Sequence, residues 1–413
     1  MNTLIKNSLF LIGMQGINYI IPLISLPYLT RKLGFYEYGM LNTSLNIILY
    51  LILFIDFGFN FSATKDIAKN RNNKLKINKI YCVTIYSKIF LSIISVISTF
   101  IIINSFGLFS DIKILVYIML PQLIYAIFFP LWLYQGLEKI SFISLCSIIS
   151  RIITLPLLFI FVNSAQDIYI TSIILSWSYL LPLLVSYFYL HIKIPYVSLG
   201  TIDIKLIAST IRKSSIIFWG SISISIYTLS TPIILSLVNN YEQVGLFIAT
   251  DKLRVAFIGI FLILGQAIYP RVNILLTENK IRYYRFIRKL ILYQIIFCGI
   301  ASVLFFIIMP KLAPFILGNN NYSNEMKFII QLMSPMIILV PLSVIISNFI
   351  LLPYGMNKIY AIIPTITLFF HIIYAIPLSK NYGAIGSSIA ILVTEIISLS
   401  LLLISYFFFI KDK

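Results

Sequence analysis

Charged residues are scarce in this sequence, and acidic residues are the scarcest. Only 11% of the 413 residues are charged, with 31 Lys or Arg against 13 Asp or Glu, whereas 60% are hydrophobic. The mean hydropathy is +0.99. A soluble domain carries roughly 25% charged residues, and a globule of this composition could not cover itself with polar surface. The composition therefore predicts a membrane protein that is solvated by lipid.

Residues that carry chemistry are equally scarce. The two histidines, His191 and His371, are far apart, and neither is near a pair of acids. The cysteines Cys82, Cys146 and Cys298 lie in apolar segments, without the spacing of metal ligands or a disulfide framework. The motifs G-x-S-x-G, H-E-x-x-H and G-x-x-x-x-G-K-[ST] do not occur. We therefore expect no enzymatic activity, no metal and no cofactor, and a protein that moves a substrate.

Long apolar segments recur along the whole chain. A transmembrane helix needs about 20 mostly apolar residues, and we predict an all-α membrane protein with about twelve such helices. The predicted spans lie at roughly 8–30, 38–57, 80–103, 114–136, 140–162, 168–190, 215–238, 245–269, 290–309, 327–352, 359–378 and 383–410. The loops between them are too short to hold a catalytic domain.

The positive charges predict the orientation of these spans. With a cytoplasmic N-terminus, the inside segments hold 21 of the 31 Lys and Arg, and the outside segments hold six. Cytoplasmic loops are enriched in Lys and Arg, so both termini are expected in the cytoplasm. This bias explains the net charge of +18 without a nucleic-acid partner.

The two halves of the chain resemble each other. The segment 34–39 follows the first span as 240–245 follows the seventh, and each leads through an apolar span into a basic loop. Six helices separate the copies, which predicts two six-helix bundles related by a parallel pseudo-repeat, a common transporter plan. We expect an N-terminal bundle at 1–195, a cytoplasmic linker at 196–213 and a C-terminal bundle at 214–413. Chance similarity between two helix pairs is the alternative.

Several prolines, including Pro121, Pro130 and Pro232, fall inside the predicted spans. Proline removes a backbone donor and bends a helix. These residues are either hinges of a rocking transporter or static features of its shape.

A few charged side chains lie within the spans, where they are costly and usually face a polar interior. The cations are Lys88, Arg151, Lys252 and Arg254, and the acids are Asp56, Asp251 and Glu395. Asp251 and Arg254 are spaced i, i+3, so they share a helix face and can pair. Lys252 points about 100° away from Asp251.

The four cations are candidates for a cationic lining that binds an anionic substrate. Lys88 and Arg151 have no acid nearby on their own helices, so we expect them to meet water or an anionic ligand. The alternative is that Lys88 reaches the inner interface and that Arg151 bonds backbone carbonyls. The acids are candidates for ion coupling, with Asp251 first and with Asp56 and Glu395 as the others, although we expect a buried structural partner for Glu395.

Polar uncharged residues also occur inside the spans, among them Gln122, Gln135 and the cluster at 42–46. Amides and tyrosines suit the hydroxyl groups of sugars, but they also hold transmembrane helices together. For any single residue we expect the second role.

The region 4–70 carries motifs of a known family. Lys6-Asn7-Ser8 opens the first span, Leu26-Pro27-Tyr28-Leu29-Thr30-Arg31-Lys32-Leu33-Gly34 closes it, and Tyr36-Glu37-Tyr38-Gly39 and Asp56-Phe57-Gly58-Phe59 follow before a polar stretch at 62–70. With these motifs the chain resembles the Wzx-type O-antigen flippases, which are polysaccharide exporters of the multidrug/oligosaccharidyl-lipid/polysaccharide superfamily. Length and helix count extend the resemblance over the whole chain.

This resemblance implies a substrate and a cellular location. The substrate would be an oligosaccharide repeat unit on undecaprenyl diphosphate, moved by alternating access from the cytoplasmic to the periplasmic face of the bacterial inner membrane. A cationic cavity would meet the diphosphate. A polysaccharide polymerase and a chain-length regulator are the implied protein partners.

Three other functions are open to such a sequence. A drug or metabolite antiporter of the same superfamily would need an essential acid in the N-terminal half, where Asp56 is the intramembrane acid. A membrane polysaccharide polymerase or ligase would need a long periplasmic loop, and the longest predicted outside loop is about residues 310–326. A channel or scaffold is the third.

Overall fold

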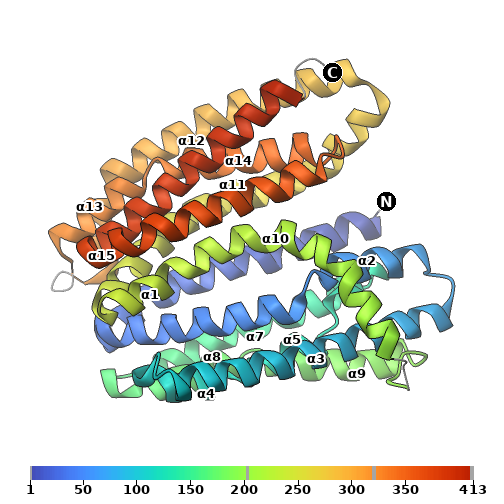
Figure 1. The fold of residues 1–413 in the computed structure, drawn as a ribbon, viewed down its shortest axis with the longest axis horizontal. Helices are drawn as coiled ribbons and strands as arrows, with labels where there is room; N and C mark the ends of the chain where they lie inside the picture. The colour runs from blue at the N-terminus through green and yellow to red at the C-terminus, as the bar shows by residue number, and fades with distance from the viewer. Residues whose placement is uncertain (1, 201–203, 319–321, 410–413) are drawn as a thin grey trace. The chain divides into compact units, whose positions relative to one another are not determined.

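Helices make up nearly all of the described chain. The computed structural model describes residues 2–200, 204–318 and 322–409, and within these ranges it contains helices and no strands (Figure 1). Parts of the predicted linker and of the predicted 310–326 loop, and the basic C-terminal end, lie outside them. The helices are α1 (Asn2–Asp56), α2 (Phe59–Lys69), α3 (Lys74–Ser105), α4 (Lys113–Met119), α5 (Gln122–Phe128), α6 (Leu131–Gly136), α7 (Ile140–Phe161), α8 (Ile168–Trp177), α9 (Leu180–Lys193), α10 (Ile204–Val238), α11 (Tyr241–Glu278), α12 (Lys280–Leu317), α13 (Asn324–Met333), α14 (Met336–Val344) and α15 (Asn357–Phe409), with 3-10 turns at Ser110–Ile112 and Ala165–Asp167 and a π-helical segment at Ile345–Leu351.

The two longest helices are each interrupted once by a glycine. Within α1, Gly34 has φ 80° and ψ 169°, and within α15, Gly383 has φ 54° and ψ −130°. A positive φ costs a residue with a Cβ more than it costs glycine, so glycine suits both breaks. Each break falls between two predicted spans, at 30–38 and at 378–383, so the glycines separate helical segments that would otherwise be continuous.

Proline stands at the start of three of the shorter helices. Pro121 and Pro130 are the residues that precede α5 and α6, and Pro335 is the residue that precedes α14. The segments Ser110–Met119 and Gln122–Gly136 are bent by 43° at the first of these breaks. The predicted bending by proline is therefore confirmed here, whereas Pro156 and Pro232 lie inside continuous helices.

The chain is a multi-pass membrane protein. Among the described residues, seven helices are long and apolar enough to cross a membrane, or eight if the bent pair counts as one span. Large apolar side chains are exposed along α3 and α12, for example Phe90, Phe100, Phe297 and Leu304. A monomeric soluble protein rarely exposes such continuous apolar surface, whereas lipid solvates it.

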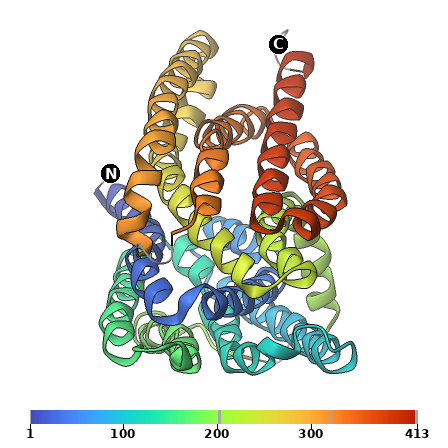
Figure 2. The same cartoon turned by 90° about the vertical axis from the view of Figure 1, so that its left-hand side faces the viewer.

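The chain divides into two compact units. The first comprises Met1–Ile17 and Leu41–Ile222, and the second comprises Asn18–Met40 and Ser223–Lys413. Within the first unit α2 packs on α6 and α3, α4 on α8, and α7 on α9. Within the second unit α14 packs between α12 and α15, and α11 packs on α12 and α13 (Figures 1 and 2). Helices α1 and α10 thus contribute residues to both units.

Two glycines let backbones meet inside the second unit. A Cβ on Gly39 would overlap the carbonyl oxygen of Tyr241, and a Cβ on Gly245 would overlap the carbonyl oxygen of Phe35. The contact is reciprocal between the two similar segments 34–39 and 240–245. Small residues permit such close approach of helices in membranes.

Many polar side chains within the helices bond the backbone of their own helix. Thr30, Ser87 and Thr99 donate to the backbone carbonyl four residues earlier. Lipid offers no partner, so a membrane helix must bond these groups itself. The Gln122 amide donates to Ser176 at 3.1 Å and joins α5 to α8, which is the helix-joining role expected for it.

Candidate functional site

In the first unit, the ammonium group of Lys88 is fully enclosed and paired. Lys88 is 1% exposed, and its Nζ lies 2.6 Å from Oδ1 of Asp56. Nζ also donates to the Ala126 carbonyl at 2.9 Å. The expectation that Lys88 meets water or an anionic ligand for want of an acid is therefore wrong. A buried charge needs a partner, and Asp56, at the end of α1, supplies it from 32 residues away.

Arg151, on α7, also lies in the first unit. Unlike Lys88, it has no carboxylate partner among the described residues. Its guanidinium donates to the Tyr179 hydroxyl at 3.2 Å and lies over the Tyr179 ring, 5.0 Å from the centroid. Tyr125 packs on Tyr179 with 5.0 Å between ring centroids. Tyr179 thus holds the guanidinium and Tyr125 packs on Tyr179, while the positive charge stays unneutralised, which suits Arg151 to bind an anion.

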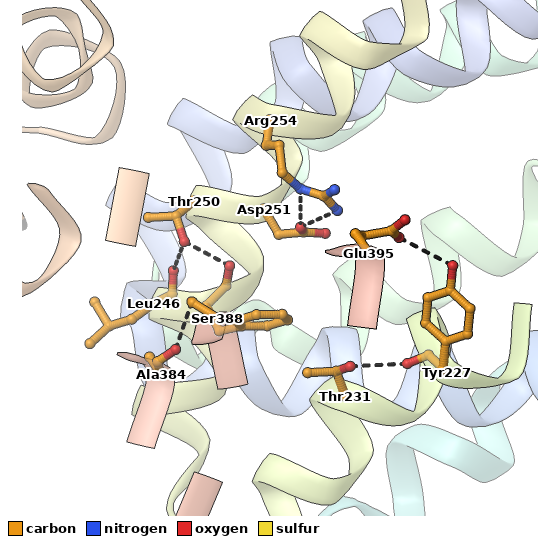
Figure 3. Close-up of polar contacts among 10 residues, drawn as sticks. Tyr227, Thr231, Leu246, Thr250, Asp251, Arg254, Ala384, Ser388 and Glu395 are labelled. Carbon is orange, nitrogen blue, oxygen red and sulfur yellow. Dashed lines mark hydrogen bonds and ion pairs between the residues drawn. The ribbon is translucent and has the colours of Figure 1, made fainter. Parts of the chain in front are cut away.

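In the second unit, α11 supplies an ion pair that the sequence predicts. Nη2 of Arg254 lies 2.6 Å from Oδ1 of Asp251, and Nε donates to the same oxygen at 2.8 Å (Figure 3). The predicted i, i+3 pairing is confirmed. Arg254 is buried, whereas the Asp251 side chain is 23% exposed.

Glu395 on α15 lies opposite this pair. The hydroxyl of Tyr227, on α10, donates to Oε1 of Glu395 at 3.1 Å (Figure 3). Arg254, Glu395 and Tyr227 line one cavity with a volume of about 190 Å³. The buried partner expected for Glu395 is therefore present, and the cavity brings it together with Arg254.

Lys252 lies one residue after Asp251 on α11, and its side chain contacts Tyr38. Its Nζ donates to the Tyr38 hydroxyl at 2.7 Å and lies 4.9 Å from the centroid of the Tyr38 ring. A cation over an aromatic face is stabilised by the ring's quadrupole. The expected separation of Lys252 from Asp251 agrees with this contact, and the sequence did not indicate Tyr38 as its partner.

A buried network around His371 was missed by sequence reasoning. The His371 ring nitrogens lie 3.1 Å from Thr231 Oγ1 and 2.7 Å from Thr394 Oγ1, and the Tyr374 hydroxyl lies 2.5 Å from Thr394 Oγ1. The network adjoins Glu395 along α15. A histidine inside a predicted span was a usable signal, but its partners are up to 140 residues away in sequence.

Within the part of the chain that the structure describes, no group of three or more His, Cys, Asp or Glu is placed to hold a metal ion.

Comparisons with known proteins link the chain to polysaccharide export. Residues 4–276 match a family described as "Polysaccharide biosynthesis protein". Two curated relatives are each named "Putative O-antigen transporter". The one from Escherichia coli K12 is 30% identical over 404 residues, which cover 96% of this chain and 95% of the relative. The one from Shigella dysenteriae is 30% identical over 400 residues, which cover 95% and 97%.

Solved structures with the same fold are transporters. The lipid II flippase MurJ in an inward closed conformation matches with a TM-score of 0.75 and 18% identity, over 97% of this chain and 87% of that one. An inward-facing multidrug resistance MATE family transporter of the MOP superfamily matches with a TM-score of 0.73 and 12% identity, over 94% and 97%. At such identities the likeness shows the fold alone.

Proposed function

Because the chain belongs to the polysaccharide biosynthesis protein family, we propose that it is a flippase for lipid-linked oligosaccharides. It moves O-antigen or related repeat units on undecaprenyl diphosphate from the cytoplasmic to the periplasmic face of the inner membrane by alternating access. The observation that carries this proposal is the relationship, over almost the full length of both chains, to two proteins named as O-antigen transporters. A transporter of this kind makes and breaks no bond.

The diphosphate of the substrate meets Arg151 in this proposal. Of the four candidate lining cations, Lys88 and Arg254 are already neutralised by Asp56 and Asp251. Arg151 keeps a net positive charge beside two tyrosine rings. A guanidinium binds phosphate oxygens through two parallel N–H bonds, so Arg151 supports the lining role more strongly than the others. Lys252 remains in the proposed lining.

The twelve-span arrangement is part of the same proposal. The breaks at Gly34 and Gly383 separate predicted spans and so support the span count, with bundles at 1–195 and 214–413 and a linker at 196–213. The cytoplasmic termini rest on the distribution of Lys and Arg. The reciprocal glycine contacts of the segments 34–39 and 240–245 support the parallel pseudo-repeat.

Energy coupling through a carboxylate also remains a proposal. Asp251 is the first candidate because part of its side chain is exposed while one oxygen holds Arg254. Movement of α11 that opens the pair with Arg254 would release Asp251 to take up a proton. Asp56 and Glu395 are the other candidates, and each is bound to a neighbouring side chain.

The antiporter and polymerase alternatives receive less support. An antiporter would need Asp56 as its essential acid, and this carboxylate is tied to Lys88 at 2.6 Å. A polymerase or ligase would need a long periplasmic loop. Among the described residues, only short segments join one helix to the next. Export with a polymerase and a chain-length regulator as partners is consistent with the proposed substrate.

The test of this function is Arg151→Ala. We expect translocation of lipid-linked oligosaccharide in proteoliposomes to fall at least tenfold, because the loss of a charge-assisted bond costs about 1.5–3 kcal/mol. Arg151→Lys should retain part of the activity, since it keeps the charge and loses the two-pronged grip. The matched control is Arg285→Ala, which removes an exposed arginine of α12.

Two results would contradict the proposal. Failure of Arg151→Ala to accumulate in the membrane would show a structural role for Arg151 and remove it from the lining. Failure of the unchanged chain to move undecaprenyl-diphosphate-linked sugar, together with proton-linked export of a small cation, would favour the antiporter.

A further inference from the structure

A cavity lies wholly within the second unit, between residues of α1, α10, α11, α14 and α15. Its volume is about 190 Å³, and its polar lining includes Tyr19, Tyr227, Arg254, Ser343, Tyr360 and Glu395. One water occupies about 30 Å³ in the liquid, whereas pockets for drug-sized ligands start at about 300 Å³. The cavity therefore has room for one compact polar group and is too small for a whole oligosaccharide.

Ser343 gives the first sign that the cavity is built for a ligand. Its side chain is buried, with 9% of the residue exposed, and its hydroxyl has no hydrogen-bond partner among the described residues. Many other buried hydroxyls of the second unit are bonded, among them Thr231, Thr250 and Ser388 (Figure 3), although that of Tyr322 is not. Leaving a buried hydroxyl unbonded costs about 1–3 kcal/mol, which a ligand in the cavity would recover.

The charges around the cavity select against a phosphate. Arg254 contributes one positive charge, whereas Asp251 and Glu395 are two carboxylates, and Asp251 already neutralises the guanidinium. A diphosphate would bring more negative charge to a site that has no excess of positive charge. The site thus differs from Arg151, which has no carboxylate partner among the described residues.

The hydrogen-bonding groups that remain suit hydroxyls. A guanidinium has five N–H donors, and the pair with Asp251 uses the Nε and Nη2 groups. Glu395 accepts from Tyr227 through Oε1, and a carboxylate can accept further bonds through its second oxygen. A sugar hydroxyl both donates and accepts, so it can bond a carboxylate, a guanidinium and Ser343 together. The tyrosines of the lining can pack their rings against the apolar face of a sugar and bond its hydroxyls through their own.

We propose that this cavity is a carbohydrate subsite, which binds one sugar residue of the transported oligosaccharide through Glu395, Arg254 and Ser343. The inference rests on the proposed function and assigns the two chemical parts of the substrate to different units. The first unit binds the diphosphate at Arg151, and the second unit reads the hydroxyl pattern of the sugar. Glu395 is then a sugar ligand rather than an ion-coupling acid.

The experiment uses the full chain in lipid nanodiscs and two separate probes. One probe is the free oligosaccharide repeat unit of the source strain's own polysaccharide, released from its lipid, and the other is undecaprenyl diphosphate without sugar. We expect Ser343→Ala to weaken oligosaccharide binding about two- to tenfold, and Glu395→Gln to weaken it about tenfold or more. Neither variant should change the binding of undecaprenyl diphosphate.

Ser388→Ala is the matched control. It removes a buried hydroxyl from α15 whose bond goes to the Ala384 carbonyl and which does not line the cavity. Its oligosaccharide binding should equal that of the unchanged chain. Ser343→Ala keeps the test valid if Glu395→Gln folds poorly, because removing an unbonded hydroxyl breaks no contact.

The possible outcomes separate this inference from the proposed function. Unchanged oligosaccharide binding in folded Ser343→Ala would overturn the subsite, as would the absence of any binding of free oligosaccharide to the unchanged chain. An equal loss of both probes would show a structural effect and also overturn it. The proposed function fails instead if the unchanged chain neither binds nor moves the intact lipid-linked oligosaccharide.

Discussion

Lys88 illustrates what an apolar helical bundle requires of a charged side chain. Its ammonium is enclosed almost completely, so an acid must lie within bonding distance, and Asp56 does. Arg151 shows a second solution, in which tyrosine rings hold a cation without cancelling its charge. Arg254 shows a third, a pair formed within one helix turn. Only this last pair is encoded in local spacing, and only this one was predicted from the sequence.

The pair of Lys88 and Asp56 leads to a stability prediction. Asp56→Asn should lower the free energy of unfolding by about 3 kcal/mol, because it leaves a buried charge without its partner. Asp66→Asn breaks the exposed pair with Lys213, whose side chains are 33% and 62% exposed, and should cost less than about 1 kcal/mol. Thermal unfolding of the purified variants in detergent measures both effects.

A second substitution checks the cause of that loss. Replacing Lys88 by Met in the Asp56→Asn background removes the unpaired charge and should restore part of the lost stability. If Asp56→Asn lowers Tm no more than Asp66→Asn does, the buried pair is not a structural element of the first unit.

At the scale of helices, glycine and proline determine where segments begin and bend. Pro121 and Pro130 interrupt one predicted span, and Gly34 and Gly383 separate the helical segments of α1 and α15. Proline and glycine are visible in sequence, so these positions could be anticipated. The close backbone contact of Gly39 with Tyr241 could not, because it joins segments about 200 residues apart.

The glycine contact gives the prediction at this scale. Gly39→Ala should destabilise the second unit and lower the amount of protein in the membrane, since its Cβ would overlap a backbone oxygen that cannot move independently. Gly299→Ala is the control, because no atom lies within 4 Å of the added Cβ. Thermal unfolding and quantitative immunoblots of membranes report both variants. Equal behaviour of the two variants would show that the helices can separate there at little cost.

At the scale of the whole molecule, the apolar surface fits a lipid environment. The apolar surfaces of α3 and α12 agree with the membrane class expected from composition. The orientation of the termini rests on the distribution of Lys and Arg and stays a prediction. The transporter fold is shared with MurJ and the MATE family transporter, both found at low sequence identity.

Reporter fusions test the predicted orientation. Tags inserted at Asn72 and Asn279 should report the cytoplasm, because these positions lie beside clusters of Lys and Arg. A tag at Asn320, which lies outside the described residues, should report the periplasm. A periplasmic signal at Asn72 would reverse the orientation and the charge bias together.

Sequence alone determined the properties that depend on composition and short spacing. These are the membrane class, the helical secondary structure, the bend at Pro121, and the pair of Asp251 and Arg254. Tertiary structure decided which remote residues meet, including Lys88 with Asp56, Arg151 with Tyr179, and Glu395 with Ser343 around one cavity. The physical reason is that hydrophobicity and helix periodicity are local, whereas the partner of a buried polar group depends on how distant helices pack.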